Sequence, residues 1–259
     1  MNYFIEGLQG SGKSILADRI AEKYPEYISV KEGDYSPVEL AWCARVNREE
    51  YEAILERYSD IRTEIENKSY REDDCIIVCY TKVRTDNRDF YRDLEQYEIY
   101  NGHTHYDEFR RIILSRFEKW NGDNMIFECS LFQNIVEDMI LFRNAADREI
   151  LDLYKEIGKT IDKKPFHIIY LKTDDIPASI DTIRRERTDQ DGNELWFPLM
   201  MRYFNESPYA LKHGLSGESE LYKHLQYRQQ LELRICQEVF PDRYTLLQSK
   251  MYRNIDFPD

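Results

Sequence analysis

The sequence predicts an α/β fold of three layers, with a parallel sheet of about five strands and helices on both faces. Two observations predict it. Short apolar runs, typical of buried strands, alternate with longer segments whose apolar residues repeat with helical spacing. The first apolar run also leads through a glycine-rich loop directly into a helical segment. The runs lie at residues 3–5, 27–30, 75–80, 125–127, 166–171 and 243–247.

Helical spacing indicates helices at residues 47–67, 131–142, 147–161, 176–187 and 221–239. Residues 89–120 are also helical in pattern, with a break at Asn101 and Gly102, whereas residues 196–214 are expected to form aromatic-lined connections. A chain of 259 residues can bury one large core. We therefore expect a single domain over residues 1–259, with a helical insertion around 84–120 and a mobile lid around 184–195.

The composition restricts the classes of partner. The formal net charge of −13 argues against non-specific binding to nucleic acid, which needs clustered lysine and arginine. No apolar run is long enough to cross a bilayer, and the chain opens on a strand instead of a leader, so we expect a cytoplasmic protein that binds no membrane. The five cysteines form no C-x-x-C pair and are expected to be reduced and buried. Association into homodimers is left open.

The glycine-rich loop carries the strongest functional signal. Residues 7–14, GLQGSGKS, match G-x-x-x-x-G-K-[ST] between a strand and a helix, which is the context that the motif requires. Glycines let the backbone turn tightly and direct several N–H groups at one point, and the helix start adds partial positive charge. Lys13 would reach the β- and γ-phosphates, and the Ser14 hydroxyl would bind Mg²⁺. The residues expected to bind ATP in this loop are Gly7, Gly10, Ser11, Gly12, Lys13, Ser14 and Ile15.

Acidic side chains follow two of the predicted strands. In open α/β sheets ligands bind beyond the carboxyl ends of the strands. Glu32 and Asp34 come after the second strand and fit either an acceptor-binding carboxylate or general base, or a solvated turn. Glu128 ends the strand at 125–127, where a carboxylate beside the phosphate loop organises Mg²⁺ or orders water.

Three arginines end the helix predicted at 176–187. Arg184, Arg185 and Arg187 precede a polar turn, as expected of a lid that closes over phosphoryl oxygens. The planar, permanently charged guanidinium suits that task. The alternative is a basic helix end that complements the helix dipole. In the first interpretation Arg184 and Arg187 act in catalysis, together with Lys13 and the two acidic residues Glu32 and Glu128, and Arg185 binds the nucleotide.

With these residues placed, the chain resembles the P-loop nucleoside and nucleotide monophosphate kinases, and among them most closely the deoxynucleoside kinase branch. The features that carry the resemblance are the loop of residues 7–14, Glu32 with Pro37, Val38 and Trp42 after it, Glu128-Cys129-Ser130, and Tyr170-Leu171 followed by Arg184, Arg185 and Arg187. The resemblance implies the P-loop NTPase fold, and it implies that Glu32 accepts the proton of the acceptor hydroxyl.

The chain departs from the family pattern in three places. Cys129 stands where the family has an arginine in a Glu-Arg-Ser or Asp-Arg-Ser motif. Four residues separate Glu32 from Pro37, which are adjacent in the family. Residues 44–120 have no clear counterpart. The phosphate loop is therefore the specific part of the resemblance, and the acceptor is not defined by it.

Taken together, these residues predict an ATP-dependent kinase. It would transfer the γ-phosphoryl of Mg-ATP to a hydroxyl or phosphate of a nucleoside, nucleotide or similar metabolite. Two alternatives stay open. One is a nucleotide-dependent regulatory ATPase or switch protein, and the other is an antibiotic-modifying phosphotransferase. A guanine-type Asn-Lys-x-Asp motif is not seen in the sequence.

Overall fold

The computed structural model describes residues 1–189 and 191–251. The chain divides into two compact units. The first joins residues 1–29 to the described residues from 121 onward, and the second spans residues 30–120. The predicted insertion around 84–120 falls inside the second unit, which begins earlier than the sequence pattern indicates.

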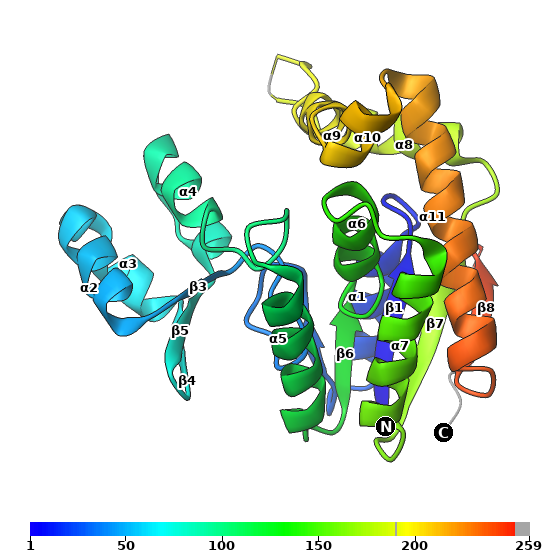
Figure 1. Cartoon of the computed structure of the whole chain (residues 1–259), viewed down its shortest axis with the longest axis horizontal. Helices are drawn as coiled ribbons and strands as arrows, with labels where there is room; N and C mark the ends of the chain where they lie inside the picture. Colours follow the sequence, from blue (N-terminus) through cyan, green and yellow to red (C-terminus); the bar gives the residue numbers. More distant parts are fainter. Residues whose placement is uncertain (190, 252–259) are drawn as a thin grey trace. The chain divides into compact units, whose positions relative to one another are not determined.

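The first unit contains the predicted parallel sheet of five strands (Figure 1). The strand order is β2-β6-β1-β7-β8, so β1 lies at the centre. It pairs in parallel with β6 on one side and β7 on the other, and β7 pairs in parallel with β8. The strands are β1 (Asn2–Gly7), β2 (Ile28–Val30), β6 (Met125–Glu128), β7 (Phe166–Lys172) and β8 (Tyr244–Gln248).

Helices cover both faces of this sheet, because successive side chains of a strand point to opposite faces. On one face Tyr3 and Ile5 pack against Leu16 of α1 (Lys13–Lys23). On the other face Phe4 stacks on Phe127, with ring centroids 5.0 Å apart, and Phe132 lies against Tyr154 and Phe240. The further helices of this unit are α6 (Gln133–Leu141), α7 (Asp147–Ile161), α8 (Ile176–Glu186), α9 (Trp196–Asn205), α10 (Pro208–His213) and α11 (Glu218–Val239).

The second unit has its own small sheet, which the sequence did not predict. The apolar run at 75–80 does form a strand, β5 (Cys75–Val78), but β5 lies between β3 (Ala44–Val46) and β4 (Ser69–Glu72) in an antiparallel sheet. Assigning it to the parallel sheet was wrong. A central strand that is covered on both faces is apolar throughout in either kind of sheet, so its pattern does not identify its neighbours.

Helices pack on this small sheet around residues such as Val46, Leu55 and Phe90. The helix predicted at 47–67 is divided into α2 (Arg48–Arg57), a 3₁₀ turn at Ser59–Ile61 and α3 (Arg62–Asn67). Residues 89–120 form two helices, α4 (Arg88–Glu95) and α5 (Tyr106–Lys119), on either side of the predicted break. A further 3₁₀ turn, η2, spans Tyr80–Lys82.

Residues 196–214 were expected to be connections, and this was wrong, because they form α9 and α10. Ser207 begins α10 by accepting a hydrogen bond from the Ala210 N–H, with Pro208 in the first turn. A Ser-Pro pair therefore starts a helix here instead of a turn. None of the helices in the described part of the chain combines the length and apolar character that a membrane crossing needs. All five cysteines are buried free thiols, as expected.

Candidate active site

The phosphate loop connects β1 to α1, as the motif predicts. Gly10 has φ of 75°, a left-handed conformation that favours glycine. A Cβ atom on Gly10 would lie 2.5 Å from Cδ1 of Ile183 in α8, so the Ile183 side chain would have to shift to admit a larger residue. Gly12 caps α1 in the left-handed region, and no side chain caps the helix start. The first turn of α1 also contains no acidic residue, so its amide groups retain the partial positive charge that suits an anion.

Lys13 is buried within this loop, with only 6% of its surface exposed. Its ammonium group donates hydrogen bonds to the carbonyl oxygens of Gly7 and Leu8, at 2.8 Å each, and to Gln133 Oε1 at 3.1 Å. Gln133 is the first residue of α6 and was not predicted as a site residue. These three acceptors fix the position of the ammonium group beside the loop.

Ser14 and Glu128, the two predicted magnesium ligands, are in direct contact. The Ser14 hydroxyl donates a hydrogen bond to Oε1 of Glu128, which is the last residue of β6. The sheet order explains this contact, because β6 is the neighbour of β1 and both strands end at the same edge. A residue 114 positions away is thereby brought to the start of α1.

A hydroxyl and a carboxylate oxygen fit Mg²⁺, which takes oxygen ligands and retains several waters. No group of three or more His, Cys, Asp or Glu side chains suited to a metal occurs in the described residues. The protein would then hold the ion through Ser14 and Glu128, and phosphate and water oxygens would complete the shell. This is the usual division for Mg²⁺ at a nucleotide.

Several ionisable residues are buried behind the loop, and none of them was predicted. Glu6 in β1 is completely buried and accepts a hydrogen bond from the Leu131 N–H at 2.7 Å. Arg228 of α11 is also completely buried and donates to Oε1 of Gln9 in the loop at 2.8 Å. Glu6 lies within an apolar strand pattern, and α11 has charged residues on all sides. The sequence pattern therefore marks neither Glu6 nor Arg228 as a buried charged residue.

The predicted lid forms a short hairpin after α8. Thr188 and Glu194 form an isolated antiparallel bridge, and Gln190 within the predicted lid lies outside the described residues. Arg184 Nε donates to Glu194 Oε1 at 2.9 Å, and its guanidinium lies 4.1 Å from the ring centroid of Phe197. Arg184 therefore joins α8 to the end of the hairpin and to the start of α9.

The other two lid arginines are exposed. The Arg187 guanidinium lies 5.4 Å from the ring centroid of Trp196, the first residue of α9. Arg185 extends from the last turn of α8. The assignment of these arginines to a phosphate clamp stays a prediction.

The two acidic candidates of the second strand belong to the second unit. Oε1 of Glu32 accepts a hydrogen bond from the indole N–H of Trp42 at 2.9 Å. Asp34 accepts from the Lys31 N–H at 3.0 Å and forms an ion pair of 3.1 Å with Lys82. Asp34 thus has the contacts of a turn residue, whereas the role of Glu32 as a base stays a prediction.

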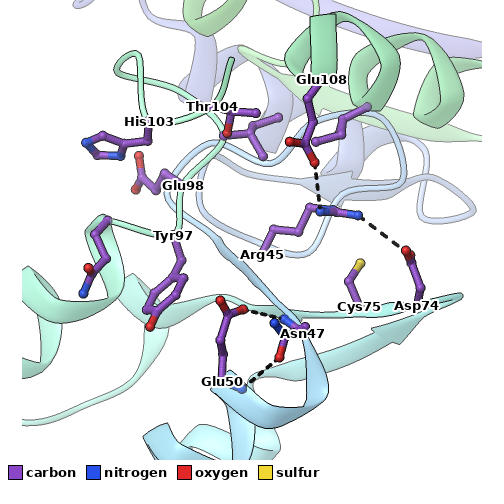
Figure 2. A pocket seen from close by; sticks show the side chains of 13 residues that line it. Arg45, Asn47, Glu50, Asp74, Cys75, Tyr97, Glu98, His103, Thr104 and Glu108 are labelled. Atoms are coloured by element: carbon purple, nitrogen blue, oxygen red, sulfur yellow. Dashed lines mark hydrogen bonds and ion pairs between the residues drawn. The ribbon is translucent and has the colours of Figure 1, made fainter. Parts of the chain in front are cut away.

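The second unit also contains a polar cavity of about 290 Å³ (Figure 2). Arg45 lies between Asp74 and Glu108, at 3.8 Å from each carboxylate. Asn47 and Glu50 on its wall form the capping box at the start of α2. Arg45 is already paired with two carboxylates of this wall, so the cavity identifies no ligand.

Comparison with known proteins gives matches among solved structures alone. No protein-family model matches the chain, and no curated protein matches it. Among solved structures, the chain is similar to a deoxyadenosine kinase from M. mycoides with bound dATP. The two are 14% identical, the alignment covers 97% of this chain and 92% of that chain, and the TM-score is 0.39.

Proposed function

We propose that the chain is a kinase that binds Mg-ATP at residues 7–14 and transfers the γ-phosphoryl group to a small acceptor. The observation that carries the proposal is the contact between Ser14 and Glu128 beside the buried Lys13. It places a hydroxyl, a carboxylate and an ammonium group at the uncapped start of α1. These are the groups that phosphoryl transfer needs, since it depends on positioning and on charge stabilisation.

The residues of the first unit have distinct roles in this proposal. Lys13 would exchange its contacts with loop carbonyls for the β- and γ-phosphate oxygens. Ser14 and Glu128 would hold Mg²⁺, which neutralises phosphate charge when bound. Arg184 and Arg187 would stabilise the charge on the transferred group, and Arg185 would bind the donor nucleotide.

The acceptor belongs to the finer part of the proposal. We propose a hydroxyl or phosphate of a nucleoside, nucleotide or similar metabolite, with Glu32 as the group that takes the hydroxyl proton. Support for this comes from the resemblance of residues 7–14, Glu32, 128–130 and 184–187 to the deoxynucleoside kinase branch. In its own unit, Glu32 accepts a hydrogen bond from the indole N–H of Trp42 through Oε1.

The test is ADP production from Mg-ATP over a panel of nucleosides, nucleotides and hydroxylated antibiotics. We expect activity that depends on one class of acceptor, and we expect Lys13→Ala to abolish it. Lys23→Ala, at the exposed end of the same helix, is the matched control and should retain activity. If the chain binds ATP normally but no compound of the panel leads to ADP production, the proposal of a kinase is contradicted. ATP hydrolysis that needs no acceptor and is stimulated by a protein partner would indicate a regulatory ATPase.

Two substitutions separate binding from transfer. Arg187→Ala should lower kcat far more than the affinity for ATP, because the arginine is expected to act on the charge of the transition state. Arg148→Ala, on the exposed surface of α7, is its control. Glu32→Gln should remove acceptor-dependent ADP and leave ATP binding unchanged. Equal losses of kcat and ATP affinity in Arg187→Ala would remove this arginine from the catalytic group.

A further inference from the structure

The phosphate loop is attached to the last long helix of the chain by one buried side chain. Arg228 of α11 donates from Nη2 to Oε1 of Gln9, across 219 positions of sequence, at 2.8 Å. Gln9 stands at a variable position of the loop motif, so the motif alone assigns it no role. Arg228 is 0% exposed, whereas Gln9 is partly exposed.

Carboxylates from two helices fix the guanidinium of Arg228. Its Nη1 donates to Oε2 of Glu137 in α6 at 2.9 Å, and its Nε lies 3.2 Å from Oε1 of Glu232. Glu232 in turn accepts a hydrogen bond from the Tyr170 hydroxyl at 2.6 Å, and Glu137 lies 3.1 Å from His224 Nε2. A buried charge is costly unless its partners are well placed. Nη1 and Nη2 of Arg228 each have a hydrogen-bond acceptor, whereas Nε lies within ion-pair distance of Glu232 without the geometry of a hydrogen bond.

Arg228 and Glu137 are both charged at neutral pH. Burial alone would raise the pKa of Glu137, but Arg228 and His224 hold it down, at about 2. Although burial opposes it, the carboxylates of Glu137 and Glu232 raise the pKa of Arg228 further above its ordinary value. The guanidinium is therefore a fixed, permanently charged donor, and Gln9 receives a charge-assisted hydrogen bond.

We propose that Arg228 is a positioning residue of the phosphate loop, which it fixes through Gln9 in the conformation that receives a triphosphate. The inference rests on the proposed function, because it assumes that residues 7–14 bind nucleotide. Gln9 lies between Leu8, whose carbonyl accepts from Lys13, and Gly10, which packs against α8. The bond to Arg228 restricts the loop in addition to the packing of Gly10, and a restricted loop loses less entropy on binding.

Gln9 is the better residue for a test, because removing Arg228 would leave two buried carboxylates without their cation. Gln9→Met keeps the length of the side chain and removes the acceptor. Arg228→Lys keeps the positive charge between Glu137 and Glu232 and removes the planar fork that reaches Gln9. Gln237→Met, on the exposed surface of α11, is the matched control.

The experiment measures the affinity of the full chain for Mg-ATP, and for inorganic tripolyphosphate, by titration calorimetry. A hydrogen bond to a charged group is worth enough for a roughly tenfold or greater loss of affinity. We expect that loss in Gln9→Met and in Arg228→Lys for both probes, and an unchanged affinity in the control. The double variant should bind each probe with no lower affinity than the weaker-binding single variant, because both substitutions break the same hydrogen bond. Thermal unfolding of each variant identifies any loss that comes from misfolding.

The outcomes separate this inference from the proposed function. If the wild type binds Mg-ATP and Gln9→Met binds it with the same affinity, the positioning role is overturned and the kinase proposal stays in place. Losses that add in the double variant also overturn it, since they would arise at independent sites. A wild-type chain that binds neither probe overturns both proposals.

Discussion

Replacing Glu6 by glutamine should make the protein more stable at neutral pH and should leave it unchanged at acidic pH. Glu6 is completely buried in the central strand β1. Its Oε1 accepts a hydrogen bond from Leu131, and its Oε2 has no hydrogen-bond partner in the described part of the chain. Burial and the charge of Glu232 raise the pKa of Glu6 to about 8, against the opposing effects of the Leu131 N–H and Lys13.

The sign and size of the effect follow from proton linkage. Between the ordinary value of 4.5 and the folded value of about 8, the folded chain holds a proton on Glu6 that the unfolded chain has released. The free energy of unfolding therefore falls as pH rises through this window, by about 1.4 kcal/mol per pH unit at most. From about pH 5 to about pH 7.5 the loss approaches roughly 3 kcal/mol, and above the folded pKa it becomes constant. Glutamine cannot ionise and retains the acceptor for Leu131.

Urea unfolding from about pH 5 to about pH 8.5, followed by circular dichroism, measures the difference between the two proteins. Glu39 and Glu98 in the second unit also have pKa values raised by burial, to about 8, so the wild-type stability should fall steeply with pH. The difference between wild type and Glu6→Gln isolates one carboxyl group. Glu22→Gln, on the exposed face of α1, is the control. Parallel stability curves for Glu6→Gln and wild type across the whole range would refute the reasoning.

Three further predictions concern other parts of the chain. Gly10→Ala should lower the midpoint of thermal unfolding and abolish ATP binding, because its Cβ would overlap Ile183 and its φ is positive; normal binding would show that the loop tolerates a side chain. Asn47→Ala should cost about 1 kcal/mol in urea unfolding, since it removes the capping box of α2, and no change would show that the cap contributes nothing. Diamide, which accepts the two thiol hydrogens, should join Cys43 to Cys79, whose sulfur atoms lie 3.6 Å apart, and peptide mapping by mass spectrometry should find this bridge in preference to any other.

The parts of the fold that sequence predicts well are those in which the signal is local. The phosphate loop combines a short strand, three glycines and a helix start within residues 2–23, and each piece is visible in consecutive letters. The helix predicted at 147–161 has the same bounds in the structure, since its apolar stripe is unbroken from Ile150 to Ile161. The contact of Glu128 with Ser14 could also be anticipated from the sequence, because the carboxyl ends of parallel strands meet at one edge of the sheet.

The parts that sequence reasoning missed depend on distant partners. The sequence of the edge strand β4 shows little alternation of apolar and polar residues. β4 pairs with β5 because the tight turn at Asp73 and Asp74 connects the two strands. The contact between Gln9 and Arg228 leaves no spacing that a single sequence could reveal, because it depends on how α11 packs beside α6. Burial of Glu6 was hidden in the same way, since an acidic residue near a strand end is usually read as exposed.

The order of the strands has a consequence for synthesis of the protein. β1 leaves the ribosome well before its neighbours in the sheet, since Tyr3 pairs with Ile126 and Asn2 pairs with Phe166. Until those segments emerge, β1 has no neighbouring strand to pair with, while residues 30–120 can already bury their own core. The loop of residues 7–14 is thus translated long before the strands that give it its shape, and a ribosome stalled after residue 120 would carry it unformed.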